Sequence, residues 1–266
     1  MVFCALTLAV LIGVAVEHAR AYNTTIFQVD NPAFDSLLGP APQVIELATS
    51  EYQLFHEGGV YHAPTHALWV VSDDVPAGDN QTNRYISCIT GFNISVTIER
   101  IVTNIPNPVG AHRYITGTPY GDVILFVAQG SLADTPPAGV YMLNPYAPYN
   151  TSLLLGSYGD YPFNSPDDIA VTSDGIIWFT DPPYGYNREI PKRSAPVLPN
   201  QVYAYDPRTS DLRVVADGFG RPNGIAASPN GKPSTSVTRA PASATARSTS
   251  RARERSTPMI VVDASW

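Results

Sequence analysis

Short apolar runs broken by turn residues dominate the chain from Tyr52 onward. Turn residues such as Gly, Pro, Asn, Asp and Ser separate the runs, a pattern typical of β-strands joined by turns. No two runs are separated by a segment that resembles a crossover helix, which argues against a parallel α/β architecture. The clearest runs are 67–73, 85–98, 122–130, 140–145, 168–171, 176–182 and 202–207.

The runs repeat along the chain. GVYMLNP (139–145) is echoed by QVYAYDP (201–207), and the corner SPDDIAV at Pro166 is echoed by RPNGIAA at Pro222. Pro166 and Pro222 are 56 positions apart, and Gly58 lies 108 positions before Pro166, close to two such periods. A repeat of this length with about four strands is what a β-propeller blade requires.

We therefore predict an all-β fold, a β-propeller of which about four blades are encoded in residues 51–232. The alternative is a β-sandwich or barrel in which the echoes are incidental.

The N-terminal segment differs from this pattern. Residues Val2–Val16 are apolar and Ala19-Arg20-Ala21 follows, which predicts a signal peptide over 1–21. An uncleaved membrane anchor is the alternative, although the run is shorter than the roughly 20 residues of a membrane span. Residues 22–50 are interpreted as an N-terminal extension.

The C-terminal segment 233–266 also departs from the repeat. From Pro233 to Ser256 the chain has no aromatic residue and one large aliphatic, Val237, which predicts disorder. A sharper interpretation is a misread frame. Codons from Lys232 onward, read one base earlier, permit a strand such as TLYVSDTG, which is what the repeat predicts after SPNGK. Residues 233–266 are therefore predicted to be a disordered or misread tail.

Composition and charge narrow the function. The formal net charge is −7, which argues against a nucleic-acid partner. The two cysteines, Cys4 and Cys88, exclude a disulfide-rich scaffold. Four Asn-x-Ser/Thr sequons accompany the signal peptide, so we expect a secreted glycoprotein that is not membrane-bound after cleavage. We also expect the protein to be a monomer. The sequons begin at Asn23, Asn80, Asn93 and Asn150.

Three corners of the repeat carry oxygen-bearing side chains. They are Glu57 in HEGGVY, Asp167 and Asp168 in SPDDIAV, and Asn223 in RPNGIAA. Inner strands of a propeller start around one channel, so these side chains can meet around a hard cation such as Ca²⁺. Each also fits a structural role: an exposed loop carboxylate for Glu57, strand-start hydrogen bonds for the aspartates, and a turn for Asn223.

Other catalytic patterns are absent from the sequence. There is no G-x-S-x-G, HExxH or P-loop motif, so serine hydrolase, zincin and nucleoside triphosphatase interpretations lose support. His56, beside Glu57, can serve as a base or ligand, but a surface or turn role is the expected one.

Residues 163–232 resemble the gluconolactonase, senescence-marker-protein (regucalcin) and fungal lactonohydrolase family. The resemblance rests on FNSPDDIAVTSDGIIWFTDPPYGY, NQVYAYDP and VVADGFGRPNGIAASPNGK, and on EGGVYHAPTHALWVVSD near Glu57. It implies a six-bladed propeller that holds one divalent cation and, in several members, hydrolyses sugar or related lactones.

By motif, the resemblance implies that Glu57 and Asn223 are metal ligands. Asp167 stands where the family usually has Asn and is implied in metal and substrate binding. The family's last metal ligand, an Asp that is also the proposed general base, is expected beyond Lys232, where no residue matches it, so the catalytic residue stays unknown.

The expected function is therefore that of a secreted, metal-dependent lactone hydrolase, incomplete in this chain, with Ca²⁺ as cofactor and a small-molecule lactone as partner. Alternatives are a metal-stabilised propeller that binds without turnover, a non-functional truncated product, and an arylesterase- or strictosidine-synthase-like propeller.

Overall fold

Antiparallel strands make up almost all of the described structure. The computed structural model describes residues 33–34, 46–78, 81–92, 95–114, 121–131, 135–187, 194–227, 234–237, 239–240 and 260–263. Within these ranges the helical residues are 33–34, the 3-10 turn η1 (Ala63–Thr65) and the short helix α2 (Tyr184–Asn187). None of the described helices is long and apolar enough to cross a membrane.

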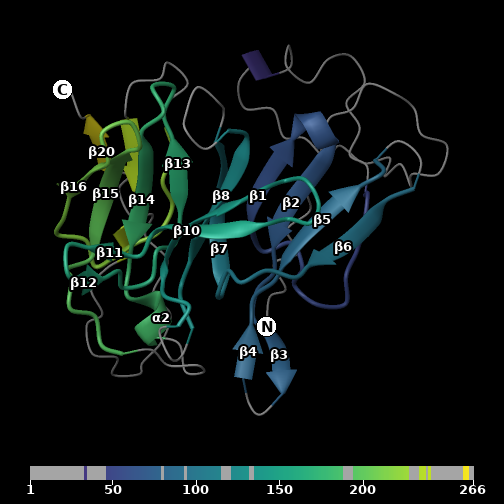
Figure 1. Ribbon diagram of the computed structural model, residues 1–266, viewed down its shortest axis with the longest axis horizontal. Helices are drawn as coiled ribbons and strands as arrows, with labels where there is room; N and C mark the ends of the chain where they lie inside the picture. The colour runs from purple at the N-terminus through teal and green to yellow at the C-terminus, as the bar shows by residue number, and fades with distance from the viewer. Residues whose placement is uncertain are drawn as a thin grey trace.

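Three four-stranded sheets form the body of the molecule (Figure 1). The first sheet contains β1 (Glu57–His62), β2 (Ala67–Val71), β5 (Ile86–Thr90) and β6 (Thr97–Ile101). The second contains β7 (Pro108–Tyr114), β8 (Val123–Ala128), β9 (Gly139–Leu143) and β10 (Thr151–Leu155). The third contains β13 (Ile169–Val171), β14 (Ile177–Asp181), β15 (Gln201–Asp206) and β16 (Asp211–Ala216). In each sheet the strands pair antiparallel in chain order, which is the meander of a propeller blade.

Shorter strand pairs lie outside these sheets. A hairpin of β3 (Val75–Gly78) and β4 (Gln81–Asn83) projects from the first sheet between β2 and β5 (Figure 1). A second hairpin joins β11 (Ser157–Tyr158) to β12 (Tyr161–Pro162). Near the C-terminus, β17 (Arg221–Pro222) pairs with β19 (Arg239–Ala240), and β18 (Ser234–Val237) pairs with β20 (Ile260–Asp263).

The segment 233–266, for which the sequence predicts a disordered or misread tail, thus contains three short strands among its described positions. These pairings do not test the reading frame, which stays a prediction. The predicted signal peptide, 1–21, lies outside the described residues. So does most of the predicted extension, 22–50.

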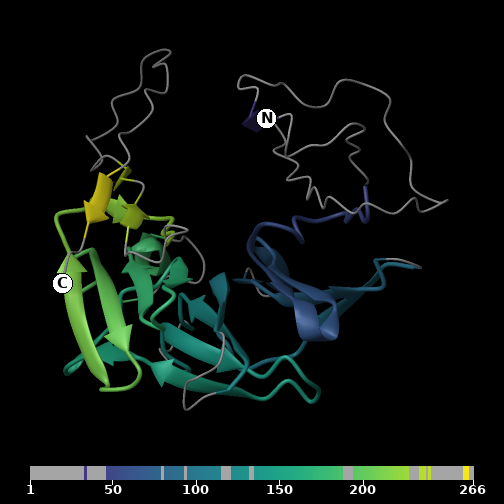
Figure 2. The same cartoon turned by 90° about the horizontal axis from the view of Figure 1, so that it is seen from above.

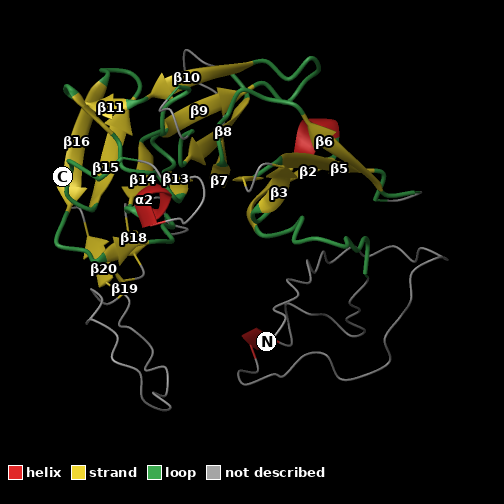
Figure 3. Cartoon of the chain, turned by 90° about the horizontal axis from the view of Figure 1, so that it is seen from below, coloured by secondary structure: helices red, strands yellow, loops and turns green. Residues whose placement is uncertain are grey.

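The first strands of the three sheets lie side by side, and the sheets spread from them in an arc (Figures 2 and 3). β7, the first strand of the second sheet, lies midway between Gly58 and Pro166, where the sequence shows no apolar run. Its sequence, PVGAHRY, holds a Gly, a His and an Arg, which hides it from a hydrophobicity pattern. Three complete sheets, followed by β17 at the Pro222 corner, agree with the predicted period and with the predicted all-β propeller class.

A glycine allows the first two sheets to approach. Gly58 has a φ of +66°, and a Cβ there would lie 2.5 Å from the carbonyl oxygen of Val109 on β7. Only a residue without a side chain fits both the backbone conformation and the contact. The EGG sequence therefore places the start of β1, with Glu57, directly against the second sheet.

The core lies between neighbouring sheets and explains the uninterrupted apolar run of β8. Ile124 and Phe126 belong to the cluster shared with the first sheet, whereas Leu125 and Val127 belong to the cluster shared with the third. Because successive side chains of a strand point to opposite faces, a strand covered on both faces needs apolar residues at every position. The cluster between the second and third sheets also contains three aromatic rings whose centroids lie 5.2–5.3 Å apart, those of Phe163, Phe179 and Tyr203.

A partly buried polar cluster also joins the first two sheets. His62, which is 0% exposed at the end of β1, places Nε2 3.0 Å from Oδ2 of Asp122 and Nδ1 2.7 Å from Oγ1 of Thr65. Arg113 on β7 donates to both carboxylate oxygens of Asp122, at 3.1 and 2.9 Å. The hydrogen bond from Arg113, supported by His62, holds the pKa of Asp122 below its usual range.

Replacing Asp122 with asparagine should destabilise the fold by about 1–3 kcal/mol, because His62 and Arg113 lose a charged acceptor. The depressed pKa means that this contribution is present above the unfolded pKa, near 4, and is lost as the pH falls through the lower folded value. Urea unfolding at pH 7 and pH 3 measures both effects, with the exposed Asp217→Asn as control. Equal midpoints for Asp122→Asn and the parent at pH 7 would contradict this role.

Candidate functional site

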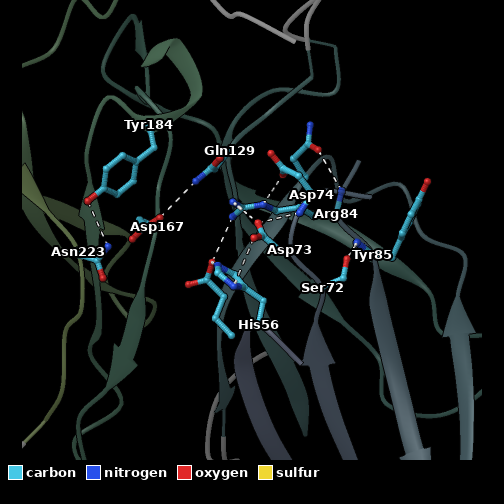
Figure 4. Close-up of polar contacts among 12 residues, drawn as sticks. His56, Ser72, Asp73, Asp74, Arg84, Tyr85, Gln129, Asp167, Tyr184 and Asn223 are labelled. Carbon is cyan, nitrogen blue, oxygen red and sulfur yellow. Dashed lines mark hydrogen bonds and ion pairs between the residues drawn. The ribbon is translucent and has the colours of Figure 1, made fainter. Parts of the chain in front are cut away.

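An open pocket of about 590 Å³ lies where the first strands of the sheets meet. Its lining is polar and comes from all three sheets and from the β17 corner: His56, Glu57, Arg84, Gln129, Asp167, Tyr184, Asn187, Arg221 and Asn223. Figure 4 shows Asn223 and Tyr184 on one side and His56 and Arg84 on the other, with Asp167 and Gln129 between them. The three predicted metal-binding residues, Glu57, Asp167 and Asn223, thus line one pocket.

Asp167 is the most buried acidic group of the pocket, at 4% exposed. Its backbone is fixed on both sides, since its N–H donates to the carbonyl of Thr180 and its carbonyl accepts from Gly110. Its Oδ1 accepts a hydrogen bond from Nε2 of Gln129 at 3.3 Å. Burial, followed by repulsion from Glu57 and Asp168, raises the pKa of Asp167 to about 8. A cation beside this carboxylate would relieve both effects.

Asp168 has a different role from its neighbour. Its Oδ2 accepts from the backbone N–H of Ile225 at 2.8 Å, and its Oδ1 accepts from that of Ile169 at 2.9 Å. Burial raises the pKa of Asp168 to about 6, although these two amide donors oppose the rise. Asp168 therefore has the structural role predicted for an aspartate at a strand start. Its hydrogen bond to Ile225 connects the third sheet to the segment after β17.

Glu57 lies at the start of β1 and is engaged through one oxygen. Its Oε1 is 3.2 Å from Nη1 of Arg84 and 3.4 Å from Nε2 of His56. The hydrogen bond to Glu57 raises the pKa of His56 above its usual value. His56 is exposed, as predicted, yet it also contacts a candidate ligand and lines the pocket.

Asn223 is oriented by two contacts. Its backbone carbonyl accepts a 2.8 Å hydrogen bond from Oγ1 of Thr180, and its Nδ2 donates to the hydroxyl of Tyr184 at 3.2 Å. Burial raises the pKa of that tyrosine, so the hydroxyl stays neutral at physiological pH. The hydrogen bond to Tyr184 fixes the orientation of the amide, whose oxygen is the atom that can bind a cation.

The donor set fits a hard divalent cation. Two carboxylates and an oriented amide oxygen are ligands that Ca²⁺ accepts. Within the described part of the chain, no group of three or more His, Cys, Asp or Glu residues is placed to hold a metal ion. The candidate site therefore depends on the amide of Asn223 in addition to Glu57 and Asp167, and the softer ligands that zinc prefers do not complete it.

Sequence reasoning missed several residues of the pocket. Gln129 directly follows β8, the second strand of its sheet. The second strand of the third sheet, β14, ends in Thr-Asp, so a polar residue at this point of the repeat was a usable signal. Tyr184 lies in PPYGY, within the segment that carries the family resemblance. Arg221 opens RPNGIAA, within the same resemblance, whereas Arg84 carried no signal in the sequence pattern.

One predicted modification site can be placed. Asn150 is exposed in the turn before β10, a position that a glycan can occupy. Asn23, Asn80 and Asn93 lie outside the described residues. Glycosylation at all four stays a prediction.

Comparison with known proteins yields consistent relatives. The family described as SMP-30/Gluconolactonase/LRE-like region matches residues 55–234. A lactonohydrolase of Aspergillus oryzae is 35% identical over 227 residues, covering 79% of this chain and 46% of that protein. A gluconolactonase of Zymomonas mobilis is 34% identical over 79 residues, covering 30% of this chain and 22% of that protein.

The fold has solved counterparts as well. The structure of a gluconolactonase from Xanthomonas campestris superposes with a TM-score of 0.54 at 22% identity, covering 72% of this chain and 57% of that one. At this identity the likeness concerns the fold, and it confirms the predicted class. The chain spans about half the length, or less, of these relatives. Because the family match covers residues 55–234, this chain belongs to the SMP-30/gluconolactonase/LRE-like family.

Proposed function

We propose that the protein carrying this chain is a secreted, metal-dependent lactone hydrolase that acts on sugar-type lactones. The observation that carries the proposal is the meeting of Glu57, Asp167 and an oriented Asn223 amide in one polar pocket. The named activities of the Aspergillus and Zymomonas relatives support lactone opening.

The residues of the pocket divide into two roles. Glu57, Asp167 and Asn223 would hold Ca²⁺, and a bound cation supplies polarisation of a carbonyl group. Gln129 fixes Oδ1 of Asp167, and Tyr184 fixes the Asn223 amide. Asn187 and Arg221 line the same pocket and offer hydrogen-bond donors to the hydroxyl groups of a lactone.

The proton-accepting residue is not assigned among the described residues. The family resemblance places it beyond Lys232, where the sequence predicts a shifted frame. We therefore expect the 266-residue chain to bind Ca²⁺ and to open lactones poorly. A protein in which the frame is restored is expected to do both.

Calorimetry with Ca²⁺, together with a pH-indicator assay of an aldonolactone with and without EDTA, tests the proposal. The expected result is Ca²⁺ binding by both proteins and EDTA-sensitive acid release by the frame-restored one. Binding without acid release would favour a metal-stabilised binding propeller, and absence of Ca²⁺ binding would refute the cation site. Sequencing the transcript across Lys232 tests the frame separately.

A further inference from the structure

Arg84 occupies an unusual position for a cation. Its side chain, labelled in Figure 4, is only 12% exposed, and the residue lies between the projecting β3–β4 hairpin and β5. Arg84 and Glu57 line the same pocket. Its backbone N–H donates to Oδ1 of Asn107, just before β7, at 3.4 Å. Asn107 in turn donates through Nδ2 to the carbonyl of Gly130 at 2.9 Å. Arg84 is thereby anchored to the second sheet as well as to the first.

The guanidinium group binds three carboxylates at once. Its Nε lies 2.9 Å from Oδ1 of Asp74, its Nη1 3.2 Å from Oε1 of Glu57, and its Nη2 3.4 Å from Oδ1 of Asp73. A planar guanidinium presents its donors in a fixed fork, whereas a lysine ammonium is a single point charge. The guanidinium group is therefore held in place by Asp73 and Asp74, which follow β2, and it fixes the position of the Glu57 side chain in turn.

The consequence for Glu57 is that its two oxygens differ. Arg84 and His56 both contact Oε1, and among the described residues no hydrogen bond to Oε2 is formed. A carboxylate with one oxygen occupied and the other open is oriented to give a cation one ligand atom. The same arrangement holds for Asn223, whose nitrogen is taken by Tyr184.

We propose that Arg84 is a positioning residue of the cation site, which aims Oε2 of Glu57 into the pocket. The inference rests on the proposed function, because it presupposes that a cation binds there. Two effects of Arg84 oppose each other. Its positive charge repels a nearby cation, whereas its fork orients a ligand of that cation; we infer that orientation is the larger effect.

The sign of the change in Ca²⁺ affinity separates these effects. Arg84→Lys retains the charge but loses the fork, so Kd for Ca²⁺ should rise about tenfold, as is usual when a partner that orients a metal ligand is lost. Arg84→Gln removes the charge as well, and its Kd should still rise several-fold. Arg208→Gln is the control: Arg208 is an exposed arginine paired with Asp206, and Kd should change less than twofold.

Calorimetry with Ca²⁺ on the full chain measures these constants, and thermal unfolding in EDTA shows whether each variant is folded. Unchanged binding in Arg84→Lys, or tighter binding in Arg84→Gln, would overturn the positioning role and leave the cation site standing. If the parent chain itself fails to bind Ca²⁺, the proposed function fails together with this inference. Should Arg84→Gln not fold, Arg84→Lys decides alone, because a pure charge effect leaves its affinity unchanged.

Discussion

Asp167→Asn is expected to weaken Ca²⁺ binding by roughly 10- to 100-fold, because affinity for this cation depends on the number of charged ligands. Asparagine, which the family usually has at this position, still offers an oxygen ligand but no charge. Asparagine keeps the size of the side chain and can still accept the hydrogen bond from Gln129. The change therefore removes charge with little change of shape. Calorimetry in a buffer without phosphate measures the difference.

The same variant should behave in the opposite sense when the cation is removed. With the pKa of Asp167 raised to about 8, its contribution to stability is fully present below the unfolded pKa near 4 and declines as the pH rises through 8. Asparagine cannot ionise, so in EDTA the variant should melt at a higher temperature than the parent at pH 8. Asp168, whose pKa is raised to about 6, also lowers the stability of both proteins as the pH rises through 6.

Asp160→Asn is the matched control for this pair of measurements. Asp160 is exposed in the turn between β11 and β12, outside the pocket, and the substitution removes the same charge. We expect neither Ca²⁺ affinity nor the pH dependence in EDTA to change. Equal Ca²⁺ affinity in Asp167→Asn and the parent would show that the charge of Asp167 does not contribute to Ca²⁺ binding.

Gly110→Ala is expected to destabilise the fold by about 3 kcal/mol or more, at the upper end of what overpacking costs, because the new methyl group meets backbone rather than flexible side chains. A Cβ at Gly110 would lie 2.7 Å from the carbonyl oxygen of Asp167 and 2.7 Å from Cα of Asp168. The hydrogen bond from the N–H of Gly110 to Asp167, 2.9 Å long, holds the two first strands together at this point. Relief of the clash must separate β7 from β13 and displace Asp167 with it.

Urea unfolding measures the loss, and Gly59→Ala is the matched control. Gly59 lies in β1, and a Cβ added there would meet no atom within 4 Å. That substitution should change stability by less than about 1 kcal/mol, as is typical where the new side chain is unobstructed. A Gly110→Ala protein as stable as Gly59→Ala would mean that the sheets are not packed as closely as described.

The repeat explains why much of the fold and part of the site could be predicted. Equivalent positions of successive blades lie at equivalent places around a common channel. The spacing of the Gly58, Pro166 and Pro222 corners thus sufficed to bring Glu57, Asp167 and Asn223 to one pocket. Apolar runs located the buried middle strands, β8 and β14, because strands covered on both faces must be apolar throughout.

The sequence alone therefore determined the all-β class, the period of the repeat and the three candidate ligands, since these follow from local pattern and repetition. The tertiary structure decided the division between Asp167 and Asp168, because the partners of Asp168 include Ile225, which is distant in the chain. It also decided the place of Arg84, Gln129 and Tyr184, which reach the pocket from three separate segments of the chain. Side-chain direction at a strand end depends on what packs against it, and contacts between distant segments leave no period in a sequence.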